Sequence, residues 1–293
     1  MGMTMDKRMA STPGGTGRNG GRGRLLVAVA LVLAVLLGWW HGRDDGSLQR
    51  IRESGVLRIG YAVEAPYAYL SGTGAVIGES PATARLIAAA MGVERLEWVL
   101  VPFSHLIADL QEGRFDLIAA GLFITEERGS QVRFSSPVLA IRSGVLLRRG
   151  EQESLRERLL TAMPVPLAVL EGAVEHQWAV LRPEFGPGLV VVPDALSGQV
   201  AVASREVDAL ALSWPATRLM AAAAPATFEA MLLPGAGETV NLTAFAFRPR
   251  DLSLQQAWER AQRQVIGSSA HLAAIAPYGF SQVDLAVGKE TAD

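Results

Sequence analysis

The sequence predicts an α/β fold with mostly parallel sheets, because short apolar strands alternate with helices along most of its 293 residues. Residues 115–120 (FDLIAA) form a continuous apolar run, as expected of a strand that is covered on both faces. Residues 81–91 (PATARLIAAAM) fit a helix, since proline suits the first turn and Gly92 favours an end. The alternation starts again near residue 166, which indicates a second unit of the same kind.

Local signals mark the ends of several expected elements. Gly113 lies beyond the helix expected at 104–111, and Thr125 is expected to cap a helix whose first turn carries two glutamates. The expected strands are residues 56–61, 96–101, 115–120, 166–170, 189–192, 207–212 and 240–247. The expected helices are residues 81–91, 104–111, 174–181, 197–203, 215–223, 253–265 and 269–276.

Composition and charge exclude two broad classes of protein. With 49% hydrophobic and 19% charged residues, the chain is too apolar to be disordered. Residues 1–24 hold five basic side chains and one acidic side chain, so the remainder is more acidic than the net charge of −2 for the whole chain. An acidic body without a basic stripe argues against nucleic-acid binding.

The first forty residues combine a basic, Gly-rich tail (1–24) with an uncharged apolar segment (25–40, LLVAVALVLAVLLGWW). This order is typical of a signal peptide or a signal anchor, and it places the following residues outside the cytoplasm, in the periplasm or at the exterior of the cell envelope. Sixteen apolar residues rise about 24 Å as a helix, short of the roughly 30 Å hydrocarbon core. The absence of an A-x-A-like site after the apolar run and the Trp39–Trp40 pair favour an uncleaved anchor, while a cleaved signal peptide stays open.

Residues suited to catalysis or metal binding are scarce. The chain has no cysteine, which excludes a lipid-modified cysteine, disulfides and thiolate chemistry. The histidines show no metal-ligand spacing, and no nucleophile elbow or phosphate loop occurs. The G-x-G-x-x-G match at residues 15–20 has no strand before it, so it does not predict a dinucleotide site. We therefore expect neither catalysis nor a metal or cofactor.

A series of motifs then follows in order along the chain. They are GVLRIG at 55–60, APYAY at 65–69, LIADLQEGRFD at 106–116, AGLFITEER at 120–128, VRFSSP at 132–137, EGAVE at 171–175, VDA at 207–209 and PYGF at 277–280. Together they resemble the family 3 extracellular solute-binding proteins of ABC importers, which serve polar amino acids and their relatives. The resemblance covers residues 48 to 280.

The resemblance implies a two-lobed periplasmic-binding-protein-like fold of type II, with the ligand held between lobes that two crossing strands join. Lobe one would comprise residues 48–138 and 244–293, and lobe two would comprise residues 143–240. Closure would be a hinge motion driven by ligand contacts to both lobes. The implied protein is a monomer that delivers a small zwitterion to ABC permease subunits. A membrane-tethered sensing or accessory module is the alternative.

Arg128 is the residue on which the expected site depends. By itself, an arginine in the first turn of a helix is usually a solvated charge. The resemblance, carried by Thr125 and Arg128, implies instead that both contribute to a site where a guanidinium binds a carboxylate through two parallel hydrogen bonds.

Three aromatic residues are expected beside it. Tyr67, Phe103 and Phe123 lie in connections between strands and helices, and such connections form the ligand crevice of open α/β sheets. Aromatic faces attract a desolvated or delocalised cation by about 0.5–2 kcal/mol each. Glu64 could accept hydrogen bonds from N–H groups of the same cation.

Lobe two is expected to contribute Gly172 and Ala173 from the glycine loop, together with Ser213 and Trp214. Typical amino-acid binders carry an aspartate where this chain has Ser213, so we expect a delocalised, cyclic or alkylated cation instead of a primary ammonium. The segments YAVEAPYAY (61–69) and GESPATAR (78–85) most resemble the ectoine and hydroxyectoine branch of the family. Glu126 and Gly129 depart from that branch, which usually has proline and cysteine there.

Overall fold

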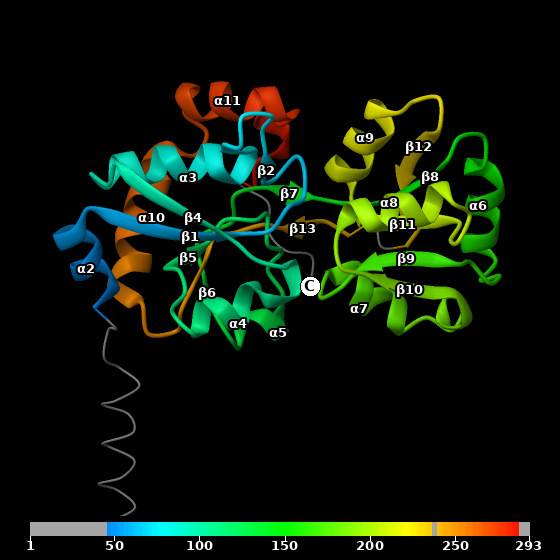
Figure 1. Cartoon of the computed structure of the whole chain (residues 1–293), viewed down its shortest axis with the longest axis horizontal. Helices are drawn as coiled ribbons and strands as arrows, with labels where there is room; N and C mark the ends of the chain where they lie inside the picture. Colours follow the sequence, from blue (N-terminus) through cyan, green and yellow to red (C-terminus); the bar gives the residue numbers. More distant parts are fainter. Residues whose placement is uncertain (1–45, 236–238, 287–293) are drawn as a thin grey trace, which may run out of the picture. The chain divides into compact units, whose positions relative to one another are not determined.

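The computed structural model describes residues 46–235 and 239–286, which belong to one compact unit that starts at Asp44. Its core is formed by two five-stranded sheets, each at the centre of its own lobe (Figure 1). The α/β, two-lobed fold predicted from the sequence is therefore confirmed. The tail at 1–24 and the apolar segment at 25–40 lie outside the described residues. Among the residues that are described, no helix combines the length and apolar character needed to cross a bilayer.

The sheet of lobe one has the strand order β4-β1-β5-β14-β6. Its strands are β1 (Val56–Tyr61), β4 (Arg95–Leu100), β5 (Leu117–Ile118), β6 (Arg133–Phe134) and β14 (Ala246–Phe247). Helices α2 (Ser47–Ser54), α3 (Glu79–Ala90), α10 (Leu252–Val265) and α11 (Ser269–Ile275) lie toward one face, and η1 (Phe103–His105), α4 (Leu106–Gln111) and α5 (Glu126–Gly129) toward the other (Figure 1). A small hairpin, β2 (Tyr69–Leu70) and β3 (Val76–Ile77), precedes α3.

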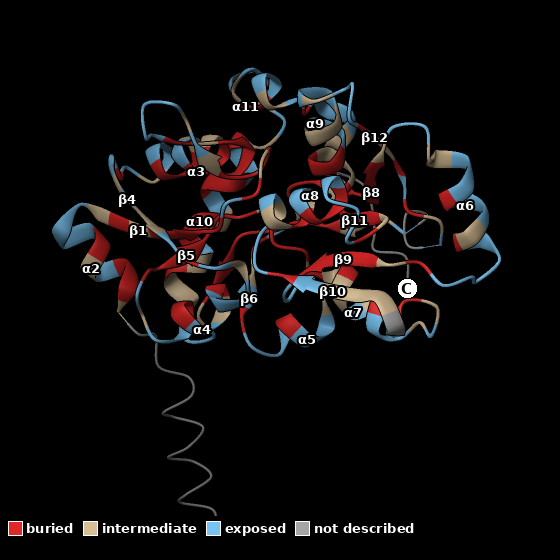
Figure 2. Cartoon of the chain, turned by 45° about the vertical axis from the view of Figure 1, so that its right-hand side comes forward, coloured by how far each residue is buried: buried red, intermediate tan, exposed pale blue. Residues whose placement is uncertain are grey.

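The sheet of lobe two has the strand order β10-β9-β11-β8-β12. Its strands are β8 (Ser143–Arg148), β9 (Leu167–Leu170), β10 (Leu189–Val192), β11 (Ala209–Ser213) and β12 (Phe228–Leu232). Helices α6 (Gln152–Leu160) and α7 (Val174–Val180) pack on one face, and α8 (Ala195–Ala203) and α9 (Trp214–Ala223) pack on the other. Figure 2 shows that strands β9 and β11 are buried between these layers.

Both sheets are more mixed than the sequence predicted. In each, the first three strands pair in parallel and the remaining pairings are antiparallel. The strand that reverses direction is β14 in lobe one and β8 in lobe two. Each of these two strands follows a crossing between lobes, so it enters the sheet from the side that faces the other lobe. The alternation of strands and helices could not reveal this reversal.

Two crossing segments connect the lobes (Figure 1). Strand β7 (Ala140–Ile141) pairs antiparallel with β13 (Asn241–Leu242), so the outgoing and returning chains lie side by side. The strand predicted at 240–247 is therefore divided, since its first part pairs with β7 and its last part, β14, joins the sheet of lobe one. The sequence analysis also missed α2, β8, α6 and β12, whose short or strongly charged segments lack a clear apolar period.

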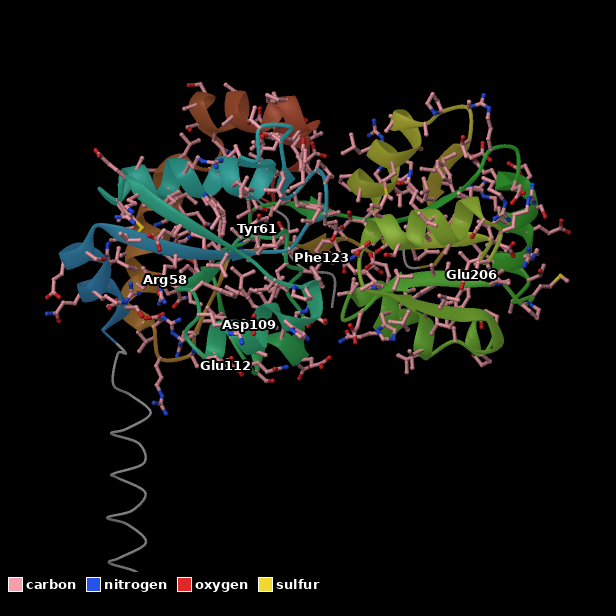
Figure 3. The ribbon with its side chains drawn as sticks, viewed as in Figure 1. Arg58, Tyr61, Asp109, Glu112, Phe123 and Glu206 are labelled. Carbon is pink, nitrogen blue, oxygen red and sulfur yellow. The ribbon has the colours of Figure 1, made fainter. Side chains whose placement is uncertain are left out.

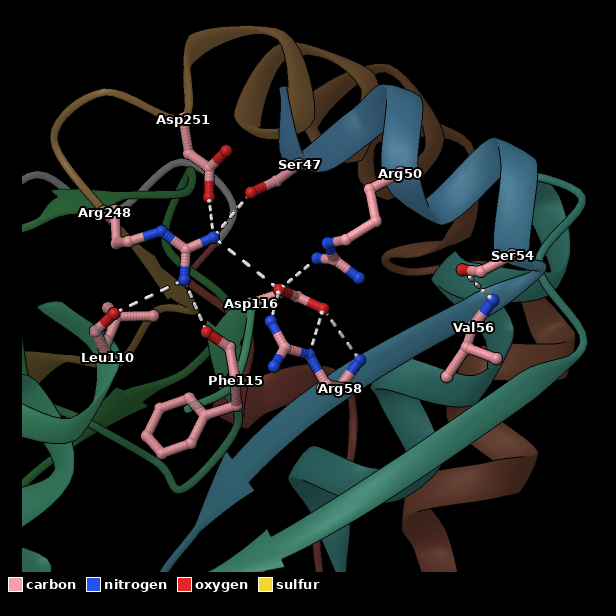
Figure 4. A network of polar contacts seen from close by, with 10 residues as sticks. All are labelled: Ser47, Arg50, Ser54, Val56, Arg58, Leu110, Phe115, Asp116, Arg248 and Asp251. Carbon is pink, nitrogen blue, oxygen red and sulfur yellow. Dashed lines mark hydrogen bonds and ion pairs between the residues drawn. The ribbon is translucent and has the colours of Figure 1, made fainter. Parts of the chain in front are cut away.

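A buried carboxylate fixes the end of lobe one that is remote from the other lobe (Figure 4). Asp116 is fully buried and accepts hydrogen bonds from the backbone N–H of Arg58 at 3.0 Å and from its guanidinium at 2.9 Å. Arg50 on α2 also binds this carboxylate, and Arg248 approaches it at 3.6 Å. Burial alone would raise the pKa of Asp116, but the hydrogen bonds from Arg58 and Arg50 outweigh it and lower the pKa. The cluster ties α2, β1 and the segment after β14 together.

We predict that Asp116→Asn lowers the free energy of unfolding by about 3 kcal/mol, because it removes the charge that compensates several arginines. Urea denaturation followed by circular dichroism measures this loss. Glu97→Gln is the matched control, since Glu97 pairs with Arg95 where both side chains are exposed (45% and 71%). That pair is worth at most about 1 kcal/mol. Equal losses in the two variants would contradict the structural role of Asp116.

Candidate ligand-binding site

A small cavity lies between the lobes, at the carboxyl ends of the parallel strands. The space it leaves for water is about 20 Å³, which is room for about one molecule. Lobe one lines it with Glu64, Tyr67, Phe103, Gly121, Phe123 and Arg128, and lobe two with Ala173, Val174, Glu175, Leu212 and Ser213. Figure 3 shows Phe123 on the side of lobe one that faces lobe two.

A tight turn after β1 places Glu64 and Tyr67 at the cavity. The backbone N–H groups of Tyr67 and Ala68 donate to the Glu64 carbonyl oxygen, and the Glu64 N–H donates to the Ala68 carbonyl oxygen. Gly121 packs against the Tyr67 ring so closely that a Cβ atom there would lie 2.5 Å from a ring carbon. Its φ of +63° also favours glycine. The position of the Tyr67 ring thus depends on a residue without a side chain.

Arg128 is held by both lobes. Thr125 caps α5 by accepting a hydrogen bond from the Arg128 N–H at 3.2 Å. The guanidinium donates to the Phe123 carbonyl oxygen at 2.8 Å and, across the gap between lobes, to the Gly172 carbonyl oxygen at 2.8 Å. Arg128 is only 6% exposed, and burial lowers its pKa, although an arginine keeps its proton in proteins. These bonds use two of its five N–H donors, so others can bind a ligand carboxylate.

Two buried carboxylates, one from each lobe, line the same cavity. Glu64 of lobe one accepts a hydrogen bond from the Ser213 hydroxyl at 3.4 Å, and Glu175 of lobe two accepts one from the Ser143 hydroxyl at 2.6 Å. Ser143 and Ser213 are direct partners in the antiparallel pairing of β8 with β11. The Cβ atoms of such partners are about 5 Å apart, so the two carboxylates bind neighbouring hydroxyls.

Burial and mutual repulsion shift the pKa values of these carboxyl groups. Burial, with the charge of Glu175 as the next cause, raises the pKa of Glu64 to about 8, against the opposing effects of Ser213 and Arg128. Burial also raises the pKa of Glu175, while the Ser143 hydroxyl, the Glu175 N–H and Arg128 act to lower it. The cavity therefore has a fixed positive charge and two acids that resist ionisation together.

The aromatic side chains have separate partners. The Arg128 guanidinium carbon lies 5.7 Å from the centre of the Phe103 ring, so this ring already faces a cation. The Tyr67 ring packs against Phe280 at 5.7 Å between ring centres. Tyr67 is 1% exposed, and its hydroxyl lies near the Ser213 side chain without a well-formed hydrogen bond within the described part of the chain. Burial and the charge of Glu64 raise the pKa of Tyr67 against the opposing effect of Ser213, so the hydroxyl keeps its proton as a donor for a ligand.

Most of the residues expected to bind the ligand come together at this cavity. The predicted residues that line it are Glu64, Tyr67, Phe103, Phe123, Arg128, Ala173 and Ser213. Two others act through Arg128, because Thr125 caps its helix and the Gly172 carbonyl oxygen accepts its hydrogen bond. Trp214 lines a separate groove with Tyr278, where Arg218 lies 5.6 Å from its ring centre. It is therefore not placed as a cover over this cavity.

The sequence analysis missed four lining residues: Gly121, Val174, Glu175 and Leu212. Glu175 matters most. Its position in the first turn of α7 fitted a residue that complements the helix dipole, and only the contact with Ser143 identifies it as part of the cavity. With Ser213 in place of the usual aspartate, that position offers a cation no carboxylate. Glu64 and Glu175 supply two carboxyl groups elsewhere in the same cavity.

Further hydrogen bonds join the lobes at the rim of the cavity. The Ser104 hydroxyl donates to Glu171 at 3.1 Å, and the Gln177 amide donates to Glu127 at 2.5 Å. Together with the Arg128–Gly172 bond, they join the α4–α5 side of lobe one to the glycine loop and α7 of lobe two. Among the described residues, no group of three or more His, Cys, Asp or Glu side chains could hold a metal ion.

The sequence is similar to those of several curated bacterial proteins. A probable amino-acid ABC transporter periplasmic-binding protein of Sinorhizobium fredii is 28% identical over 167 residues, which are 56% of each chain. Cyclohexadienyl dehydratase of Pseudomonas aeruginosa is 34% identical over 119 residues, 40% of this chain and 43% of the enzyme. Membrane-bound lytic murein transglycosylase F of Photobacterium profundum is 28% identical over 57% of this chain and 32% of its own length. The chain thus spans about a third to a half of these curated relatives.

Among solved structures, EhuB in complex with hydroxyectoine has a TM-score of 0.74 and 29% identity, over 82% of this chain and 94% of EhuB. The model of the bacterial extracellular solute-binding proteins, family 3, matches residues 57–278. This match includes both sheets and all the residues that line the cavity. The chain belongs to the family 3 bacterial extracellular solute-binding proteins.

Proposed function

We propose that this protein is the solute receptor of an ABC importer, acting outside the cytoplasm, and that it captures a small zwitterion of the ectoine or amino-acid class for permease subunits in the membrane. One observation carries the proposal: a single buried cavity contains a guanidinium that can bind a carboxylate and two carboxyl groups that can bind a cation. Opposite charges fixed in one dry cavity favour a ligand with the complementary charges. Arg128 would bind the ligand's carboxylate.

The cation end of the ligand would lie near Glu64 and Glu175, with the Tyr67 and Phe123 rings as further contacts. Both carboxylates favour N–H donors, which a quaternary ammonium lacks. The 29% identity to EhuB, whose structure contains hydroxyectoine, supports a cyclic delocalised cation. We propose that the protein releases its ligand chemically unchanged, so that binding, closure and delivery make up its whole activity.

We predict that Arg128→Ala weakens hydroxyectoine binding at least a hundredfold, because the carboxylate would enter a dry cavity without its partner. Arg128→Lys should weaken it at least tenfold, since a lysine keeps the charge but cannot form two parallel hydrogen bonds. Isothermal titration calorimetry measures both affinities, and chromatography of the recovered ligand checks that it is unchanged.

Arg95→Ala is the control, because this exposed arginine lies outside the cavity. Thermal shifts with ectoine, hydroxyectoine, a betaine and amino acids then rank the ligands, and saturation at about 100 times the dissociation constant should add roughly 2.7 kcal/mol of stability. Unchanged affinity in Arg128→Ala would contradict the site. Failure of every zwitterion to bind the wild type would contradict the ligand class.

We predict that Tyr67→Phe raises the melting temperature of the ligand-free protein and weakens hydroxyectoine binding several-fold. The change removes a buried hydroxyl that forms no well-aligned hydrogen bond, which relieves a cost of at most about 1–3 kcal/mol, and it also removes a donor available to the ligand. Differential scanning fluorimetry and calorimetry measure the two effects. Tyr61→Phe is the control, since Tyr61 is a buried tyrosine outside the cavity lining. A variant that binds as tightly as the wild type would show that the Tyr67 hydroxyl does not contact the ligand.

A further inference from the structure

The cavity between the lobes contains two buried carboxyl groups, those of Glu64 and Glu175. We infer that Glu64 and Glu175 together hold one proton in the ligand-free closed cavity and that the ligand's cation displaces it, so that solute capture is coupled to proton release. This inference rests on the proposed function. It also makes Glu175 a ligand-binding residue of lobe two.

Ser143 and Ser213, the serines that bind Glu175 and Glu64, are paired across β8 and β11. The two carboxylates therefore lie in the same cavity. Glu64 is 8% exposed and Glu175 is 3% exposed, so bulk solvent screens their charges poorly. Like charges this close and this buried do not both ionise without a cation between them.

The charged groups around Glu64 and Glu175 do not balance if both carboxylates are ionised. The groups that face the pair are Arg128 from α5, Tyr67 from the turn after β1, and the two serine hydroxyls. Glu127 on α5 also acts on the Arg128 charge, and its carboxylate binds Gln177 at the rim. Glu79 on α3 lies farther away and acts on Tyr67. Only Arg128 is positive, so it balances one ionised carboxylate and leaves the second uncompensated. A proton neutralises that second group in the empty cavity.

A ligand changes this balance. A zwitterion brings a carboxylate that engages Arg128 and a cation that lies against Glu64 and Glu175. The cation then stabilises both carboxylates, and the O–H bond of the protonated carboxyl breaks as its proton passes to solvent buffer. The pKa of Glu64, about 8 without ligand, supports this exchange, because at pH 7 most of the ligand-free protein would hold the proton.

We predict that hydroxyectoine binding at pH 7 releases close to one proton per ligand. Calorimetry in buffers of different ionisation enthalpy measures this number directly. The dissociation constant should fall with rising pH between about 6 and 8, by up to tenfold per pH unit, and level off above 8. The direction follows because the ligand-free site binds the proton that the liganded site lacks.

Three variants identify the groups responsible. Glu64→Gln should abolish proton release, and Glu175→Gln should reduce it, since Glu64 then loses the like charge that raises its pKa. Both variants should bind more weakly. Glu171→Gln makes the same charge change in the same glycine loop, but Glu171 binds Ser104 outside the cavity lining. It should release as many protons as the wild type. Tight wild-type binding without proton release would overturn the inference.

The ligand-free protein provides a test that does not depend on the choice of solute. In wild-type protein at pH 6.5, infrared spectra should contain the C=O band of a buried protonated carboxyl that titrates near pH 8 and is absent in Glu64→Gln. If hydroxyectoine does not bind but this band is present, the proposed ligand class is wrong and the proton site stands. If the spectra of the two proteins are identical, the inference is wrong.

Stability gives a second ligand-free measure with a defined sign. The folded state holds a proton on Glu64 up to about pH 8, whereas the unfolded chain loses it near the ordinary value of 4.5. The free energy of unfolding should therefore fall as pH rises from about 5 to 8. Thermal melts should show a steeper fall for wild type than for Glu64→Gln. Glu79, whose pKa burial raises to about 7, is present in both proteins and cancels in the comparison.

Discussion

The charge balance in the dry space between the lobes constrains the rest of the site. Arg128 is 6% exposed and bonded to both lobes, while Glu64 of lobe one and Glu175 of lobe two line the same cavity. Buried charges are costly unless they are paired, so this set of groups can be closed off from water only in particular protonation or ligand states. The same buried charges therefore determine both which ligands the cavity can bind and the free energy of its closure.

The fold brings these groups together because both lobes use the same sheet topology. The parallel strands of each lobe end at the cavity, and the segments that follow them carry Glu64, Phe123 and, at the start of α7, Glu175. The reversed strand β8 enters directly from a crossing segment and supplies Ser143 next to Ser213. The hinge motion that the family resemblance implies would therefore move the serine pair and Glu175 as one body relative to Arg128 and Glu64.

The sequence predicted the architecture and most of the cavity, because alternating apolar segments and ordered motifs depend on local chemistry. Glu175 was missed for a physical reason: its role depends on Ser143, 32 residues away along the chain and in another strand. Trp214 lines a separate groove, since adjacent residues at a helix start can face different spaces, so its expected contact with the ligand stays a prediction. The pairing of β8 with β11, on which the role of Glu175 depends, leaves no periodic signal in one sequence.

Closure without a ligand has a defined electrostatic cost in this arrangement. In this structure the Arg128–Gly172 bond joins the lobes and Glu64 and Glu175 line one cavity, so on the proton site inferred above an empty closed state would take up a proton. A closed state that contains a zwitterion needs no such proton, because the cation compensates the second carboxylate. The difference favours closure on a ligand over empty closure more strongly as pH rises. If the protein acts as the proposed receptor, a partner that recognises the closed lobes would therefore meet the ligand-bound form preferentially in alkaline surroundings.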